Sequence, residues 1–116
     1  MKIEELENAP KWLLEADTKN ANVEIIDGRV HWYGGVWCGG EWRGGEWYDG
    51  TWHHGTWCGG EWHCGMWLGG IWEGGDWHGG LWYSGIWRGG TWHDGSWEGG
   101  VWKGGFRFTE TAPIHP

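Results

Sequence analysis

The stretch VWCGGEWRGGEWYDGTWHHG, residues 36–55, repeats the five-residue unit that decides the fold of this chain. The unit is close to xWxGG, and it places a tryptophan at every fifth residue from Trp32 to Trp102. The last residue of each unit is always glycine, from Gly35 to Gly105, whereas the residue before it is sometimes Asp, His, Cys or Ser. Glycine adopts positive φ angles without steric cost, so the repeat predicts tight turns between very short strands.

Tryptophan supplies nearly all of the apolar side-chain volume of the repeats. The chain has 116 residues, of which 16 are Trp and 26 are Gly. A row of exposed indoles would form an apolar patch far larger than a soluble monomer presents, so we expect these side chains to form the core. The expected core residues are Trp32, Trp37, Trp42, Trp47, Trp52, Trp57, Trp62, Trp67, Trp72, Trp77, Trp82, Trp87, Trp92, Trp97 and Trp102.

Turn chemistry predicts an all-β repeat built as a meander of short antiparallel strands with a stacked Trp core. Each xWx would be a strand, and each GG or DG doublet a two-residue turn that is left-handed at both positions. The Trp of one strand would then face the Trp of the next at a closely spaced cross-strand pair, for example Trp52 and Trp57.

A five-residue period also resembles that of the pentapeptide-repeat β-solenoids, in which GxWxG would place Trp at the centre of each side. The resemblance implies four sides, or about 20 residues per coil, and a contact between Trp52 and Trp72. Indoles would overfill such a coil unless it widened, because Trp is much larger than the Leu or Phe that the family uses. This four-sided β-solenoid is the alternative fold.

Four units look like copies of one module fifteen residues apart: EWYDG, EWHCG, DWHGG and TWHDG, which begin at residues 46, 61, 76 and 91. A triangular coil of that length is expected to be too narrow for three inward indoles. We therefore interpret the similarity as duplication history.

The motif GEW at 40–42 and 45–47, with its glycine and aromatic rhythm, resembles the MORN repeats, whose glycine-punctuated hairpins carry similar motifs. Trp/Gly pentapeptides also look like those of bacteriophage accessory and structural proteins. These resemblances imply a structural role and a viral or phage particle as one setting, and they assign no site residues.

The two ends of the chain lack the repeat. Residues 1–21 carry helix signals, including Pro10, Trp12 and Leu13, and predict an N-terminal helical cap. The repeat domain is expected to span 22–108 and a C-terminal tail 109–116. Arg107 stands where the next Trp would stand, and its guanidinium is expected to cap the stack on Trp102.

The sequence before the first repeat predicts a β-hairpin. VEII and RVHW flank Asp27-Gly28, a residue pair typical of a type I′ turn. In that register one face of the hairpin carries Val23, Ile25, Val30 and Trp32, where the Trp face begins.

Charge and composition exclude several functions. The net charge is −8, so the basic surface that nucleic acid requires is missing. No secretory signal and no apolar run of membrane-spanning length are found, so we expect no membrane contact and a cytoplasmic or virion-associated protein. Three cysteines without a CxxC pair indicate reduced thiols.

Metal binding is expected to be absent, with Cys58, His63 and Cys64 as the weak candidates. On a meander His53 and His63 would lie too far apart to share an ion. No cofactor motif, nucleophile elbow or phosphate loop occurs, and a flat ribbon offers no pocket that would perturb a carboxyl pKa. The chain is therefore predicted not to be an enzyme. The carboxylates expected on the outer face are Glu41, Glu46, Glu61, Glu73, Asp76 and Glu98.

The sequence favours a structural or assembly protein that self-associates or joins a larger particle. The alternative is a binding module that engages a protein or a glycan through its acidic outer face or its end tryptophans.

Overall fold

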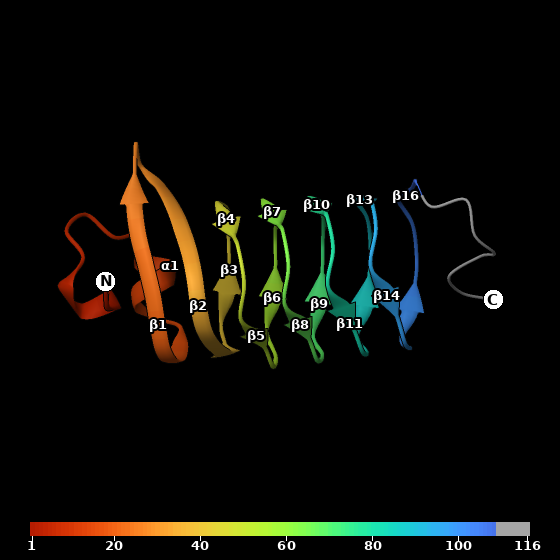
Figure 1. Cartoon of the computed structure of the whole chain (residues 1–116), viewed down its shortest axis with the longest axis horizontal. Coiled ribbons are helices and arrows are strands. Elements are labelled where there is room, and N and C mark those ends of the chain that lie inside the picture. Colours follow the sequence, from red (N-terminus) through yellow and green to blue (C-terminus); the bar gives the residue numbers. More distant parts are fainter. Residues whose placement is uncertain (109–116) are drawn as a thin grey trace.

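In the computed structural model, which describes residues 1–108, the repeats form a three-sided β-solenoid with a small cap at its N-terminal end (Figure 1). The cap holds the 3-10 turn η1 (Ile3–Glu5) and the helix α1 (Lys11–Leu14). Strands β1 (Asp17–Ile26) and β2 (Arg29–Gly39) follow and pair with each other antiparallel. Beyond them the coils stack along the long axis of the molecule (Figure 1).

Three faces run along the solenoid, and each is a ladder of parallel strands. Face 1 consists of residues 31–32 of β2, then β4 (Glu46–Trp47), β7 (Glu61–Trp62), β10 (Asp76–Trp77), β13 (Thr91–Trp92) and β16 (Phe106–Arg107). Face 2 consists of residues 36–37 of β2, then β5 (Thr51–Trp52), β8 (Met66–Trp67), β11 (Leu81–Trp82) and β14 (Ser96–Trp97). Face 3 consists of β3 (Glu41–Trp42), β6 (Thr56–Trp57), β9 (Ile71–Trp72), β12 (Ile86–Trp87) and β15 (Val101–Trp102).

One coil takes fifteen residues, because each repeat strand pairs in register with the strand three repeats later, as Trp57 pairs with Trp72. The predicted all-β repeat with a stacked Trp core and a small N-terminal helix is confirmed. The predicted antiparallel pairing of successive repeats is wrong. The β-solenoid predicted as the alternative is confirmed, but its coil has three sides and fifteen residues in place of four sides and about 20 residues. The similarity of modules fifteen residues apart reflects the coil itself, in which equivalent residues occupy equivalent places.

Three indoles fit inside such a narrow coil because they meet edge to face. Trp57 contacts its neighbours in the coil, Trp52 and Trp62, at ring-centroid distances of 5.8 Å and interplanar angles of 72° and 74°. Along the axis Trp57 stacks on Trp72 at 4.8 Å and 6°. Both arrangements are favourable for aromatic quadrupoles. The prediction that a triangular coil is too narrow for three inward indoles is wrong, because edge-to-face contacts let the three rings share the interior of the coil.

The corners of the coil require glycine at only one of their two positions. The second glycine has a positive φ, +112° at Gly60, whereas the first position, such as Gly59, does not. The predicted turn, left-handed at both positions, is therefore wrong for the repeats. A Cβ on Gly60 would lie 2.5 Å from the carbonyl oxygen of Gly45, whereas a Cβ on Gly59 would meet nothing within 4 Å. Gly60 is thus needed both for its φ angle and for the close approach of the preceding coil.

Backbone hydrogen bonds join each coil to the one before it. The Ile71 amide donates to the Gly55 carbonyl at 3.0 Å, and the Glu73 amide donates to the Trp57 carbonyl at 2.8 Å. The same pair of bonds recurs along the three faces, so the Trp strands are held in register from both sides.

The N-terminal cap closes the first coil with apolar side chains. Leu13 is fully buried, and Trp12 packs against Trp42 at a ring-centroid distance of 5.2 Å. Asp27 and Gly28 have φ angles of 51° and 77°, which confirms the predicted hairpin turn. Strand β1 begins at Asp17, inside the segment 1–21 that was expected to be helical, because this segment extends the pairing with β2.

Burial of the indoles falls off at the C-terminal end. The repeat tryptophans are buried from Trp32 to Trp92, and Trp97 and Trp102 are partly buried. Arg107 is in register with Trp92 and follows it in the column that begins at Trp32, and Trp102 stacks on Trp87. The capping of Trp102 by the Arg107 guanidinium stays a prediction. The tail predicted for 109–116 lies outside the described residues.

A matched pair of substitutions tests the role of the corner glycine. We expect Gly60→Ala to lower the free energy of unfolding by at least about 2 kcal/mol, because the new Cβ combines a forbidden φ with a backbone clash. Gly59→Ala should change it by less than about 1 kcal/mol. Urea unfolding followed by Trp fluorescence measures both values, and equal losses for the two variants would contradict this account of the corner.

Candidate functional site

Face 1 carries two outward rows of side chains with a consistent chemistry. The row that precedes the tryptophans is His31, Glu46, Glu61, Asp76, Thr91 and Phe106. The row that follows them is Tyr33, Tyr48, His63, His78, His93 and Phe108. Acidic groups therefore lie beside imidazoles along the middle of this face.

The second row is a continuous stack of rings on the surface. His63 stacks on Tyr48 at a centroid distance of 5.0 Å and on His78 at 5.1 Å, with interplanar angles of 8° and 11°. His78 in turn stacks on His93 at 4.7 Å. The strand spacing sets these distances, as it does for the indoles inside. Stacking limits rotation of the imidazoles and keeps them in one row.

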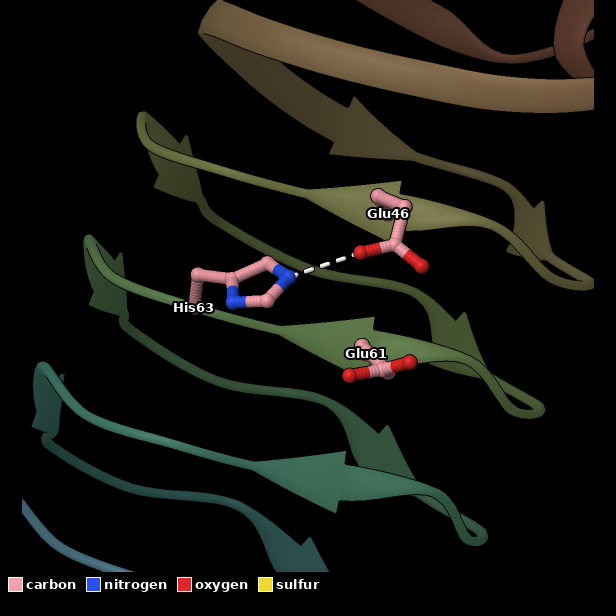
Figure 2. Close-up of side chains that lie close together, drawn as sticks. All are labelled: Glu46, Glu61 and His63. Carbon is pink, nitrogen blue, oxygen red and sulfur yellow. Dashed lines mark hydrogen bonds and ion pairs between the residues drawn. The ribbon is translucent and has the colours of Figure 1, made fainter. Parts of the chain in front are cut away.

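Each of these imidazoles reaches a carboxylate of the preceding coil. His63 Nε2 lies 2.7 Å from Glu46 Oε1, as Figure 2 shows. The equivalent distances are 3.0 Å from His78 Nε2 to Glu61 Oε1 and 3.2 Å from His93 Nε2 to Asp76 Oδ1. The partners are seventeen residues apart in each case. The face therefore bears a ladder of imidazole–carboxylate pairs.

Glu46 is the most constrained carboxylate of this ladder. Its Oε2 accepts a hydrogen bond from Arg29 at 2.7 Å while Oε1 faces His63, and only 16% of its side chain is exposed. Burial acts to raise the pKa of Glu46, but the hydrogen bonds from His63 and Arg29 outweigh it and lower that pKa below its usual value. Glu46 is thus held as a charged, oriented acceptor.

Glu46, Glu61 and His63 converge on one point of face 1. One ligand atom from each lies within 4.8 Å of the other two, the one such group of three found in the described part of the chain. Figure 2 shows Glu61 on β7, whose next residue along the chain is His63, beside the Glu46–His63 pair. Two carboxylates and one imidazole form a donor set that divalent transition metals accept.

The weak metal candidates from the sequence are not brought together. His63 lies on face 1, Cys58 follows β6 on face 3, and Cys64 occupies a corner position after β7. His53 follows β5 on face 2, so it does not share a face with His63. The three cysteines are free, and Cys64 is exposed. Burial raises the pKa of the Cys58 thiol, an effect that disfavours the thiolate form which metals require.

The outward carboxylates also divide among the three faces. Glu46, Glu61 and Asp76 share face 1, whereas Glu41 and Glu73 lie on face 3 and Glu98 lies on face 2. Sequence reasoning placed all six on one face because it assumed a flat meander. The informative signal was the recurrence of an acid followed by His seventeen residues later, which has meaning only with a fifteen-residue coil.

Comparison with protein-family models, curated proteins and solved structures found no match to this chain. In residues 1–108, neither helical element has the length and apolar character needed to cross a membrane.

The charge state of Glu46 should contribute to stability in a pH-dependent way. Because its folded-state pKa lies below the ordinary value of 4.5, this contribution is complete above that value and is lost as the pH falls through the lowered folded pKa. We expect Glu46→Gln to lower the free energy of unfolding by about 1 kcal/mol at neutral pH and by much less in strong acid.

Urea unfolding at several pH values checks this dependence. Glu98→Gln, which removes a carboxyl group from face 2, is the matched control and should show a smaller effect at neutral pH. If Glu46→Gln lowered the free energy of unfolding by the same amount at all pH values, the shape of the Glu46 side chain rather than its charge would be responsible for the loss of stability.

Proposed function

We propose that this chain is a non-enzymatic structural or assembly protein, a rigid spacer that joins a larger cytoplasmic or virion-associated particle. The observation that supports this proposal best is the unbroken, in-register stacking of indoles along all three faces. Trp47, Trp62 and Trp77 in one such column are 4.8 Å apart from ring to ring, with interplanar angles of 6° to 7°.

Rigidity follows from how successive coils are joined. Bending the solenoid between two coils would open stacked indoles on one side and lengthen backbone hydrogen bonds such as that from Glu73 to Trp57. Interiors that are packed closely and bonded in this way resist small deformations. A spacer needs this property, whereas an enzyme needs a concave site, and the imidazoles and carboxylates described above lie on outward faces.

Exposed apolar side chains on the last coil support the proposal that another protein docks there. Phe106 and Phe108 are 75% and 66% exposed, and Val101 is 50% exposed. The opposite end is covered by the cap, where Leu13 is buried and Trp12 packs on the first coil. Because the two most exposed large apolar side chains of residues 1–108, Phe106 and Phe108, lie in the last coil, we propose a closed pair of two chains that meet at their last coils, not an open filament.

We propose that this chain shares features of its architecture with known repeat proteins. The five-residue side is shared with pentapeptide-repeat solenoids, and the glycine and aromatic rhythm with MORN repeats and phage structural proteins. The three-sided coil of Trp differs from the four-sided coil expected of the first group. We propose that the likeness reflects a common use of short glycine-cornered units as rigid scaffolds.

The alternative role is that of a binding module. A surface hollow at the cap is lined by Lys11, Trp12, Glu15, Gly40, Glu41 and Arg43, and it exposes part of an end tryptophan. An aromatic edge with charged neighbours is suited to a glycan, and the acidic row of face 1 to a basic protein. Tryptophan fluorescence titrated with a glycan panel tests this role, and a response lost in Trp12→Ala would favour it.

Association through the last coil is tested by comparing masses in solution. We expect the chain to form a dimer at micromolar concentrations, and the double variant Phe106→Ser/Phe108→Ser to be monomeric, because the exposed apolar area is removed. Light scattering after gel filtration gives the masses. Tyr83→Ser, which removes an exposed aromatic side chain from face 2, is the control and should leave the dimer intact. A native chain that stays monomeric would overturn self-association.

A further inference from the structure

Glu46, Glu61 and His63, which converge on face 1, lie outside the tryptophan core. The side chains of Glu46 on β4, of Glu61 on β7 and of His63 just after β7 point outward, whereas the tryptophans of these two strands face the interior. Exposed acidic groups often lie together without a ligand, but here the third member is an imidazole, whose Nε2 lies 2.7 Å from Glu46 Oε1 with Glu61 beside the pair (Figure 2). From this geometry we propose that Glu46, Glu61 and His63 bind a divalent transition-metal ion of the zinc class.

The donor atoms select this class of ion. Imidazole nitrogen suits zinc, copper and nickel, whereas magnesium and calcium prefer a shell made only of oxygen. One imidazole and two carboxylates leave a fourth position of a tetrahedral ion for water. The two negative charges of Glu46 and Glu61 offset the positive charge of the ion. The guanidinium of Arg29 balances part of the negative charge of Glu46.

The distances require only small movements of surface side chains. Two atoms bound to one zinc ion lie about 3.3 Å apart, from metal–ligand bonds of about 2.0 Å. The His63 Nε2 to Glu46 Oε1 distance of 2.7 Å must lengthen, and atoms now up to 4.8 Å apart must approach each other. The His63 side chain is 35% exposed and can move, whereas the Glu46 side chain is 16% exposed and can stay in place.

Neighbouring groups already hold two of the three ligands in place. Arg29 binds the Oε2 of Glu46 at 2.7 Å and leaves Oε1 for the ion. Tyr48 and His78 stack on the two sides of the His63 ring. Such outer partners orient metal ligands and reduce the entropy that binding must overcome. His78 also contacts Glu61 Oε1 at 3.0 Å, so Glu61 has its other oxygen to offer.

The same positions one and two coils later make a graded series. Glu61, Asp76 and His78 repeat the pattern with a shorter acid, and their imidazole–carboxylate contact is longer, at 3.0 Å. In the next coil Thr91 replaces the second carboxylate beside Asp76 and His93. The chain therefore carries one complete set, one looser set and one set that lacks a carboxylate, and binding should be tightest at His63.

Protons and the metal compete for the same nitrogen. His63 Nε2 contacts Glu46 Oε1 through a proton in the metal-free protein, and an ion must displace that proton to use the nitrogen lone pair. Binding of the ion should therefore release that proton.

Calorimetric titration with Zn²⁺ tests the site in the full chain with Cys38, Cys58 and Cys64 changed to Ser, which removes thiolate ligands. We expect saturable binding that weakens at least about tenfold in His63→Asn and in Glu61→Gln, since each removes a direct ligand. His53→Asn removes an imidazole from face 2 and is the matched control, with affinity expected to be unchanged. Mg²⁺ should not compete.

Two further measurements identify the ligands. Imidazole NMR signals of His63 should shift on Zn²⁺ addition before those of His93, and near-UV circular dichroism should show that the Trp stack of each variant is intact. The proposal is overturned by the absence of Zn²⁺ binding, by equal binding in His63→Asn and the parent, or by binding that requires the cysteines. The titration does not depend on whether the chain dimerises, because Phe106→Ser/Phe108→Ser should bind Zn²⁺ equally well.

Discussion

Parallel strands in register lie about 4.8 Å apart, and this is also a favourable distance for two stacked indoles. In this chain the two distances coincide, since Trp57 and Trp72 are at once a strand pair and a stacked ring pair separated by 4.8 Å. The same rise per coil along the axis therefore forms the backbone hydrogen bonds between strands and stacks the indoles of the core. The small number of aliphatic residues in the repeats follows, because indoles fill the interior there, and Leu13, Val23 and Val30 add to the core only at the N-terminal end.

That coincidence sets strict conditions at the corners. Successive coils approach so closely that a Cβ on Gly85 would meet both the Gly70 carbonyl oxygen and Trp67 Nε1, at 2.5 Å and 3.1 Å. The indole N–H groups thus face the corner of the next coil. Trp82 Nε1 donates to the Gly99 carbonyl at 2.9 Å, whereas eleven other buried indole N–H groups of residues 1–108, that of Trp67 among them, have no hydrogen-bond partner. Glycine at this position gives the backbone its turn and leaves room for the indole of the preceding coil.

The sequence was sufficient for the all-β repeat, the Trp core and the Asp27-Gly28 hairpin, because these depend on local chemistry. It was not sufficient for the pairing of strands. A GG doublet allows a hairpin turn or an open corner, and only packing between Trp57 and Trp72 decides between them. The acid–imidazole pairs of face 1, such as Glu46 with His63, depend on that pairing. They could be recognised only after the coil length was known.

The inside and the outside of this solenoid have different periods. The core repeats every five residues, since any side may follow any other with the same indole and the same corner glycine. The surface repeats every fifteen, since only then does His78 return above His63. Loss or gain of a single five-residue unit would therefore leave the core nearly undisturbed, yet it would turn every later side chain onto the next face. Evolution of such a chain can conserve its fold while rearranging its surface in steps of one third of a turn.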